Sequence, residues 1–285
     1  MKLSNIILRS LAVFVGVSVA QALAGMLATL VLPSKTALPS FGPHFAQWML
    51  LSNALTVAAL TLLAVRTDWR GWKLGFAVAS IPAVITIIDA IEGAFFLKNS
   101  HIEWPNILLM TIIAAALSVP VWMLLFGKRA DTPRKHFHPI ASKSRGQRMW
   151  RFVVCDVAYL VLYLTAGTII WPYIKAFYAT QAVPPMSSIF AMQLLLRGPV
   201  FVLLCLLLLR MLGLPRLSGA LAVGIVFTLL SGVAPLLIPN PYFPDSVRFA
   251  HLCEVSSSNF LFAAIVAWLW GQPGTAQAQE LAHAA

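Results

Sequence analysis

Charged residues are scarce in this sequence, and their scarcity excludes an ordinary soluble domain. Only 10% of the 285 residues are charged, 60% are hydrophobic, and the mean hydropathy is +0.84. A soluble domain carries about a quarter charged residues. The composition therefore predicts a polytopic membrane protein, for which the usual relation between chain length and number of soluble domains does not hold.

Acidic residues are rarer still, with nine against twenty lysines and arginines, which gives a net charge of +11. Such an excess is one feature of proteins that bind nucleic acid. In this chain, however, the basic residues lie at the ends of apolar runs, where they act as topology signals. We therefore predict no nucleic-acid partner.

Motifs for several chemistries are missing as well. The sequence has no P-loop, no G-x-G-x-x-G, no H-E-x-x-H, no paired haem histidines and no aspartate-rich prenyl-diphosphate motif. Its three cysteines, Cys155, Cys205 and Cys253, lie inside apolar runs without a Cys-x-x-Cys spacing, which is typical of small buried residues. We predict neither a metal nor another cofactor.

Long apolar runs are what the sequence has in abundance. Eight runs reach the roughly 20 residues that cross a bilayer, and proline-rich segments separate several of them. The predicted fold class is an all-α polytopic integral membrane protein with eight transmembrane helices. The predicted spans are residues 8–31, 45–65, 74–97, 105–126, 151–173, 187–209, 217–238 and 248–270.

The first run allows two interpretations. Its basic start, apolar middle and Ala22-Leu23-Ala24 are similar to a secretory signal peptide with a cleavage site. Apolar residues continue as far as Leu32, beyond a typical signal core. This extension favours an uncleaved first helix.

Basic residues also predict the orientation. Fifteen lysines and arginines flank one set of span ends and four flank the other, while Arg197 lies inside a span. Because cytoplasmic loops carry the excess, we predict cytoplasmic termini and a location in the cell inner membrane. The segment Lys128–Arg151 holds eight basic residues and one acid. We expect it to be a cytoplasmic connector that contacts anionic lipid headgroups.

The connector divides the spans into two groups of four that are similar to each other. A shift of 144 residues aligns Arg66 with Arg210, a shift of 139 aligns Arg9 with Arg148, and loop lengths and charge pattern also match. A unit with an even number of crossings gives two halves of equal orientation. We therefore predict two parallel four-helix repeats. The predicted units are the first repeat at 1–127, the connector at 128–150, the second repeat at 151–271 and a disordered tail at 272–285.

Polar side chains inside the spans are costly in hydrocarbon, so they mark functional or paired groups. They form pairs or stripes at helical spacing in spans three, six and eight. Counted at about 1.5 Å per residue, all of these groups fall in the non-cytoplasmic half of the membrane, which predicts one polar cluster there. The candidates for proton handling or catalysis are Glu254, His251, Asp89 and Glu92. The candidates for substrate binding are Arg197, Gln193, Asn259, Ser258, Arg248 and Asn53.

Glu254 and His251 lie one helical turn apart and form the best candidate for a proton-handling pair. A metal site is not predicted from them, because two-metal sites in helix bundles use more ligands and a second histidine. A purely structural salt-bridge network between the two halves is the other interpretation of the same charges.

Two functional hypotheses follow from this pattern, with a third behind them. The first is a transporter or permease for a small, anionic solute, with proton-handling carboxylates and with Arg197 as the anion-binding group. The alternative is a membrane-embedded enzyme that acts on a lipid or polyprenyl substrate from the non-cytoplasmic side. The second alternative is a non-catalytic assembly or sensor subunit. The sequence leaves the solute and the oligomeric state open.

Overall fold

The computed structural model describes residues 2–33, 44–97, 103–127, 143–240 and 242–271. These residues form helices and no strands, and eight helical spans are long and apolar enough to cross a membrane. The predicted all-α, eight-span fold class is therefore confirmed. Six spans are single helices: α1 (Leu3–Val31), α2 (Phe45–Arg66), α3 (Gly71–Phe96), α4 (Trp104–Phe126), α5 (Arg145–Tyr178) and α10 (Asp245–Trp270).

Two spans are interrupted by a π-helical turn. The sixth consists of α6 (Met186–Met192), η1 (Gln193–Arg197) and α7 (Gly198–Leu212). The seventh consists of α8 (Arg216–Thr228), η2 (Leu229–Val233) and α9 (Ala234–Leu237).

The fifth span is longer than predicted at both ends. It begins with a capping box, in which the backbone N–H of Gln147 donates to the Ser144 hydroxyl and the backbone N–H of Ser144 donates to the Gln147 side chain. The last residues of the expected connector are thus helical. The rest of the connector, 128–142, and the tail, 272–285, lie outside the described residues.

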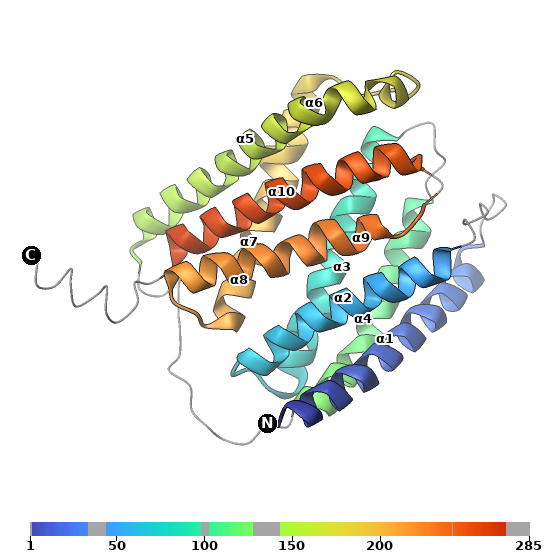
Figure 1. Cartoon of the computed structure of the whole chain (residues 1–285), viewed down its shortest axis with the longest axis vertical. Helices are drawn as coiled ribbons and strands as arrows, with labels where there is room; N and C mark the ends of the chain where they lie inside the picture. The colour runs from blue at the N-terminus through green and yellow to red at the C-terminus, as the bar shows by residue number, and fades with distance from the viewer. Residues whose placement is uncertain (1, 34–43, 98–102, 128–142, 241, 272–285) are drawn as a thin grey trace, which may run out of the picture.

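The spans form two layers (Figure 1). One layer contains α5, α10, α8 with α9, α2 and α1 in that order, and α7, α3 and α4 lie behind it. The helix α1 begins and α10 ends at the same end of the bundle, which we call the terminal end. The opposite end, where α3 ends and α10 begins, is called the cavity end below.

Small residues hold α1 against α4. Gly16 lies so close to α4 that a Cβ placed on it would approach Cγ1 of Val121 to 2.8 Å. Ala20, Ala24 and Ala28 follow at intervals of four residues and are all buried. A four-residue spacing of small side chains lets two membrane helices approach closely.

The two groups of four spans share one contact pattern. In each group the first span packs on the second, the second on the third, the third on the fourth and the fourth on the first. Arg9 Nη1 donates to the carbonyl of Leu125 at 2.8 Å, and Arg151 Nη1 donates to the carbonyl of Leu269 at 2.7 Å. The two leucines are related by the 144-residue shift, whereas Arg151 and not Arg148 is the counterpart of Arg9. The duplication itself stays a prediction.

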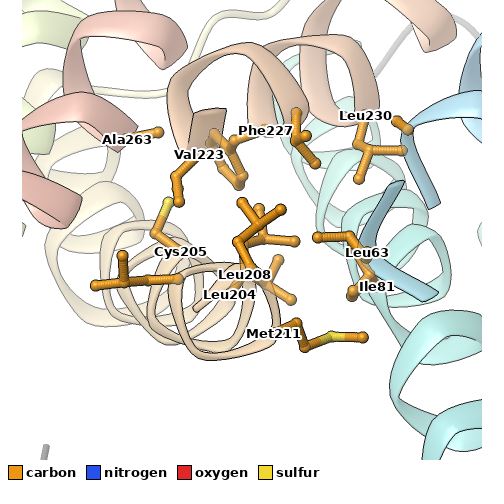
Figure 2. Close-up of a cluster of buried hydrophobic side chains, with 14 of the residues drawn as sticks. Leu63, Ile81, Leu204, Cys205, Leu208, Met211, Val223, Phe227, Leu230 and Ala263 are labelled. Atoms are coloured by element: carbon orange, nitrogen blue, oxygen red, sulfur yellow. The ribbon is translucent and has the colours of Figure 1, made fainter. Parts of the chain in front are cut away.

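The terminal half of the bundle has an apolar core centred on α7. Figure 2 shows side chains of α7 meeting those of α2, α3, α8 and α10, with Leu208 among Leu63, Ile81 and Val223. Cys155 and Cys205 are buried, as predicted, but Cys253 is exposed. It is exposed because it lies on the face of α10 opposite the buried Glu254 and Asn259.

Candidate functional site

A cavity of about 650 Å³ lies between α3, α5, the sixth span, the seventh span and α10. At the cavity end its walls include Leu97, Val183 and Phe243, which stand at helix ends. Its deepest residues include Asn259, fourteen residues into α10, which corresponds to about 21 Å of helix. The cavity wall therefore extends from the cavity end of the bundle to just beyond the middle of α10.

Four aromatic side chains close the bottom of this cavity. The ring centroids of Tyr159 lie 5.5 Å from Phe201 and 5.1 Å from Phe262, and Phe227 lies 5.0 Å from Phe201 and 6.0 Å from Phe262. All four are buried. We call these residues the aromatic floor. Below the floor lies the apolar core of Figure 2, and the carboxylate of Asp156, one turn before Tyr159, packs against Gly198 beside the floor.

An arginine with two carboxylates forms one wall. Arg197 Nη2 lies 3.2 Å from Oδ1 of Asp89, and Arg197 Nη1 donates to Oε2 of Glu92. The side chain of Gln193 donates to the other oxygen of Glu92 at 3.2 Å. The guanidinium also lies 5.0 Å from the ring centroid of Phe201. The structure thus joins spans three and six through charge-assisted hydrogen bonds, which compensate for taking these charges out of water.

A hydrogen-bonded chain forms the facing wall. His251 Nδ1 lies 2.7 Å from Oε2 of Glu254, and His251 Nε2 lies 3.0 Å from the hydroxyl of Tyr178. An ionised carboxylate can only accept, so Nδ1 carries the hydrogen, and Nε2 of a neutral imidazole accepts from the phenol. A proton can pass along such a chain when the imidazole takes it at Nε2 and releases it from Nδ1.

Some polar atoms on the cavity wall have no partner among the described residues. They are the hydroxyls of Tyr159 and Tyr163 and the second oxygen, Oε1, of Glu254. Glu254 Oε1 faces the bare backbone of Gly167, where an added Cβ would lie 3.5 Å away. These atoms are available to a bound molecule.

Two further polar residues of α10 that line the cavity, Asn259 and Ser258, form hydrogen bonds within the protein. The Asn259 side chain donates to the Ser231 hydroxyl at 2.8 Å, and that hydroxyl donates to the carbonyl of Phe227 at 2.7 Å. The Ser258 hydroxyl donates to the carbonyl of Glu254 on its own helix at 2.8 Å. A serine bound to its own helix in this way is a poor nucleophile candidate.

Both π-helical turns lie beside the cavity, and each is followed by a proline. Pro199 comes two residues after η1 ends, and Pro235 comes two residues after η2 ends. Proline has no N–H to donate and clashes with the carbonyl four residues earlier, and π turns are common next to functional sites. Here they carry Gln193 and Arg197 in one span and Ser231 in the other.

Of the ten candidate residues, seven line the cavity and three do not. The lining residues are Asp89, Glu92, Arg197, His251, Glu254, Ser258 and Asn259. Gln193 lies behind Glu92 and is fully buried.

Arg248 and Asn53 are placed away from the cavity wall. Arg248 Nη1 donates to the carbonyls of Leu236 and Leu237, at 3.1 and 2.9 Å, and Nη2 contacts Asp245. It therefore satisfies the C-terminal carbonyls of α9. Asn53 donates to the side chain of Gln21 at 2.7 Å, which links α2 to α1.

Sequence reasoning missed the contribution of α5. Tyr159, Tyr163, Gly167 and Trp171 recur every four residues and all line the cavity, and Tyr178 follows at the end of the helix. The signal was present as a stripe of tyrosine and glycine on one helical face. It is harder to notice than a charge, because aromatic residues are also common in membrane helices for packing.

No group of three or more His, Cys, Asp or Glu side chains in the described ranges could hold a metal ion. The chain matches no family model, no curated protein and no solved structure. The site is therefore interpreted from its own geometry.

Proposed function

We propose that this protein is a membrane transporter or permease that takes up a small solute from the non-cytoplasmic side. The observation that carries the proposal is the cavity of about 650 Å³, which opens at one end of the bundle and stops at the aromatic floor. Such a shape is expected for one state of alternating access, in which the site is reached from one side only. Buried ionisable groups at the site support this function over a structural role.

The orientation is part of the proposal. The excess of basic residues at the terminal end supports cytoplasmic termini in the cell inner membrane, with the cavity open to the other side. Lys143 and Arg151 stand at this end with Arg216, and partial burial together with the charges of these two arginines lowers the pKa of Lys143. This gathering of cations supports contact between Lys128–Arg151 and anionic headgroups.

Proton handling would fall to the chain of Tyr178, His251 and Glu254. The geometry places a carboxylate, an imidazole and a phenol in sequence along the cavity wall, with gaps of 2.7 and 3.0 Å. Coupling requires a group that gains and loses a proton as the solute binds and leaves. Glu254 can do this because one of its oxygens faces the cavity while the other is held by the histidine.

Reconstitution tests the proposal. Purified protein in proteoliposomes with an imposed pH gradient is exposed to a panel of labelled small cations, zwitterions, anions and neutral solutes. We expect uptake of at least one class above empty liposomes, and its loss in Glu254→Gln. The matched control is Asp245→Asn, which makes the same chemical change at an 88% exposed side chain on the same helix. No uptake of any class, or uptake unchanged in Glu254→Gln, would contradict the proposal.

A second candidate function is a membrane-embedded enzyme acting on a lipid or polyprenyl substrate. Two observations favour it. In the Tyr178–His251–Glu254 chain, a histidine that can act as a base is held by a carboxylate. The cavity wall also includes Thr168 and Trp171, which are exposed on the outer surface of α5, so lipids could enter the cavity from the bilayer between helices. Mass spectrometry of lipid extract after incubation with protein, compared with a His251→Gln variant, tests this function.

A further inference from the structure

We infer that the cavity binds an organic cation, namely an ammonium group carried on an apolar or aromatic body. This inference rests on the proposed function, because it names the solute class for the same cavity. It can still be tested by binding alone, without transport. It replaces the anionic solute expected from the sequence.

The charges on the cavity wall sum to a negative value. The described lining residues include three carboxylates, one arginine and one histidine. With all three carboxylates ionised, their formal charge is −2 with a neutral imidazole and −1 with a charged one. A cavity with a surplus of negative charge and apolar walls concentrates cations and repels anions.

The one cation of the site is already engaged. Both terminal nitrogens of Arg197 are bound to carboxylates, Nη2 to Asp89 and Nη1 to Glu92. Only Nε is left without a partner, and it is buried. An anionic solute would have to displace a carboxylate from the guanidinium and then lie next to it, which is unfavourable.

A carboxylate oxygen of Glu254 gives a second argument, which does not depend on this charge count. Glu254 is only 9% exposed, and its Oε1 faces the cavity beside Gly167 without any hydrogen-bond partner in the described part of the chain. A carboxylate oxygen accepts hydrogen bonds, and an ammonium N–H is the donor that also compensates its charge. The free hydroxyls of Tyr159 and Tyr163 add two further acceptors on the neighbouring helix.

The rest of the cavity suits the body of such a molecule. Phe96, Trp171 and Phe243 line the walls with several aliphatic side chains. Aromatic faces attract cations and apolar walls bury hydrocarbon. The volume of about 650 Å³ is within the range of roughly 300–1,000 Å³ typical of small-molecule sites.

Three matched probes test the inference on the purified, full-length protein in detergent. Phenylpropylammonium, phenylpropanol and phenylbutanoate share one aromatic body and differ in the charge of the head group. Isothermal titration calorimetry measures their binding to the unmodified chain, to Glu254→Gln and to the control Asp245→Asn. Gly167→Val is a further variant that narrows the space beside Glu254 and leaves every charge in place.

We expect the ammonium probe to bind, and Glu254→Gln to weaken it about tenfold or more, as for loss of a charge-assisted hydrogen bond. Gly167→Val should weaken it as well, and Asp245→Asn should not. Tighter binding of phenylbutanoate, absence of binding by all three probes, or an affinity unchanged in both cavity variants would overturn the inference. Binding of the ammonium probe without any uptake in proteoliposomes would instead retain the inference and reject the transport function.

Discussion

The two halves of this bundle differ in the residues that the sixth, seventh and eighth spans contribute to them. Toward the cavity end, these spans and their neighbours contribute Arg197, Ser231, Glu254 and Asn259 around an empty volume of about 650 Å³. Toward the terminal end, the same spans contribute leucine, valine, phenylalanine and cysteine in a packed core. The aromatic floor divides them. One half encloses a cavity and the other is tightly packed, so substitutions should have different effects in the two halves.

Removing the central cation should have the largest effect. Arg197→Met leaves Asp89 and Glu92 without a counter-charge, and breaking a buried ion pair from one side costs about 3–5 kcal/mol. We expect little folded protein, measured by monodispersity and thermal unfolding in detergent. Replacing all three groups together, with Asp89→Asn and Glu92→Gln added, should restore folding, because no unpaired charge remains. An Arg197→Met protein as stable as the unmodified chain would show that the ion pairs do not hold the spans together.

A phenylalanine of the floor, Phe227, and one at the rim of the cavity, Phe243, should differ in their contribution to stability. Phe227→Ala removes a ring that is fully buried, and such truncations cost about 3–5 kcal/mol. Phe243→Ala removes a ring from the rim of the cavity, where the space left behind joins an existing volume. The loss of unfolding free energy in Phe243→Ala should therefore be smaller than that in Phe227→Ala by at least about 2 kcal/mol. Equal losses of stability would mean that the cavity end is packed as tightly as the core.

Two glycines, one in each half, differ in the space around their Cα atoms. A Cβ on Gly75 would lie 2.6 Å from the carbonyl oxygen of Val119 on α4, whereas one on Gly167 would lie 3.5 Å from Glu254 Oε1. We expect Gly75→Ala to destabilise by about 1–3 kcal/mol through overpacking. Gly167→Ala should be neutral or slightly stabilising, because alanine favours the helix. Thermal unfolding of both variants measures the two changes in stability. A larger loss in Gly167→Ala than in Gly75→Ala would contradict this packing.

The smallest expected effect concerns Asn53, a polar residue outside the cavity. Asn53→Ala removes its hydrogen bond to Gln21, worth about 0.5–1.5 kcal/mol. The affinity for the ammonium probe should stay the same. A clear loss of affinity in this variant would place α2 nearer to the solute than the structure does.

The fold was largely predictable because hydropathy and loop charges report directly on crossings. All eight spans were found, and the ends differ mainly where polar residues continue a helix, as at Arg145–Arg151 in α5. The π turns were not predicted, because their sequence signal is a proline that an ordinary kink would also explain.

The candidate site was predictable where it is charged. Asp89, Glu92, Arg197, His251 and Glu254 all line the cavity, since charges in hydrocarbon must find one another. Arg248 and Asn53 lie elsewhere, because carbonyl groups and neighbouring amides satisfied them locally. The pairing of His251 with Glu254 followed from their spacing, but the partners of Arg197 did not. Arg197 was expected to hold a solute anion, and only the three-dimensional arrangement reveals that two carboxylates already occupy it.

Transport by alternating access requires that the packed core below the aromatic floor open to the terminal side, and two native cysteines test this directly. Cys155 lies one turn before Tyr159 and Cys205 one turn after Phe201, so both stand just below the floor and both are buried. A protein with Cys253→Ser keeps only these two thiols. In inside-out vesicles with the proposed orientation, a charged, membrane-impermeant methanethiosulfonate reagent can reach them only if the packed core below the floor opens to the terminal side.

We predict modification of Cys155 or Cys205 from the cytoplasmic side at a rate that changes with the pH gradient, and modification of a Ser258→Cys reporter from the opposite side. If Ser258→Cys reacts while both native cysteines stay unmodified under every gradient, the core below the floor does not open to the terminal side. The cavity would then be a closed pocket, and the transport account would be contradicted.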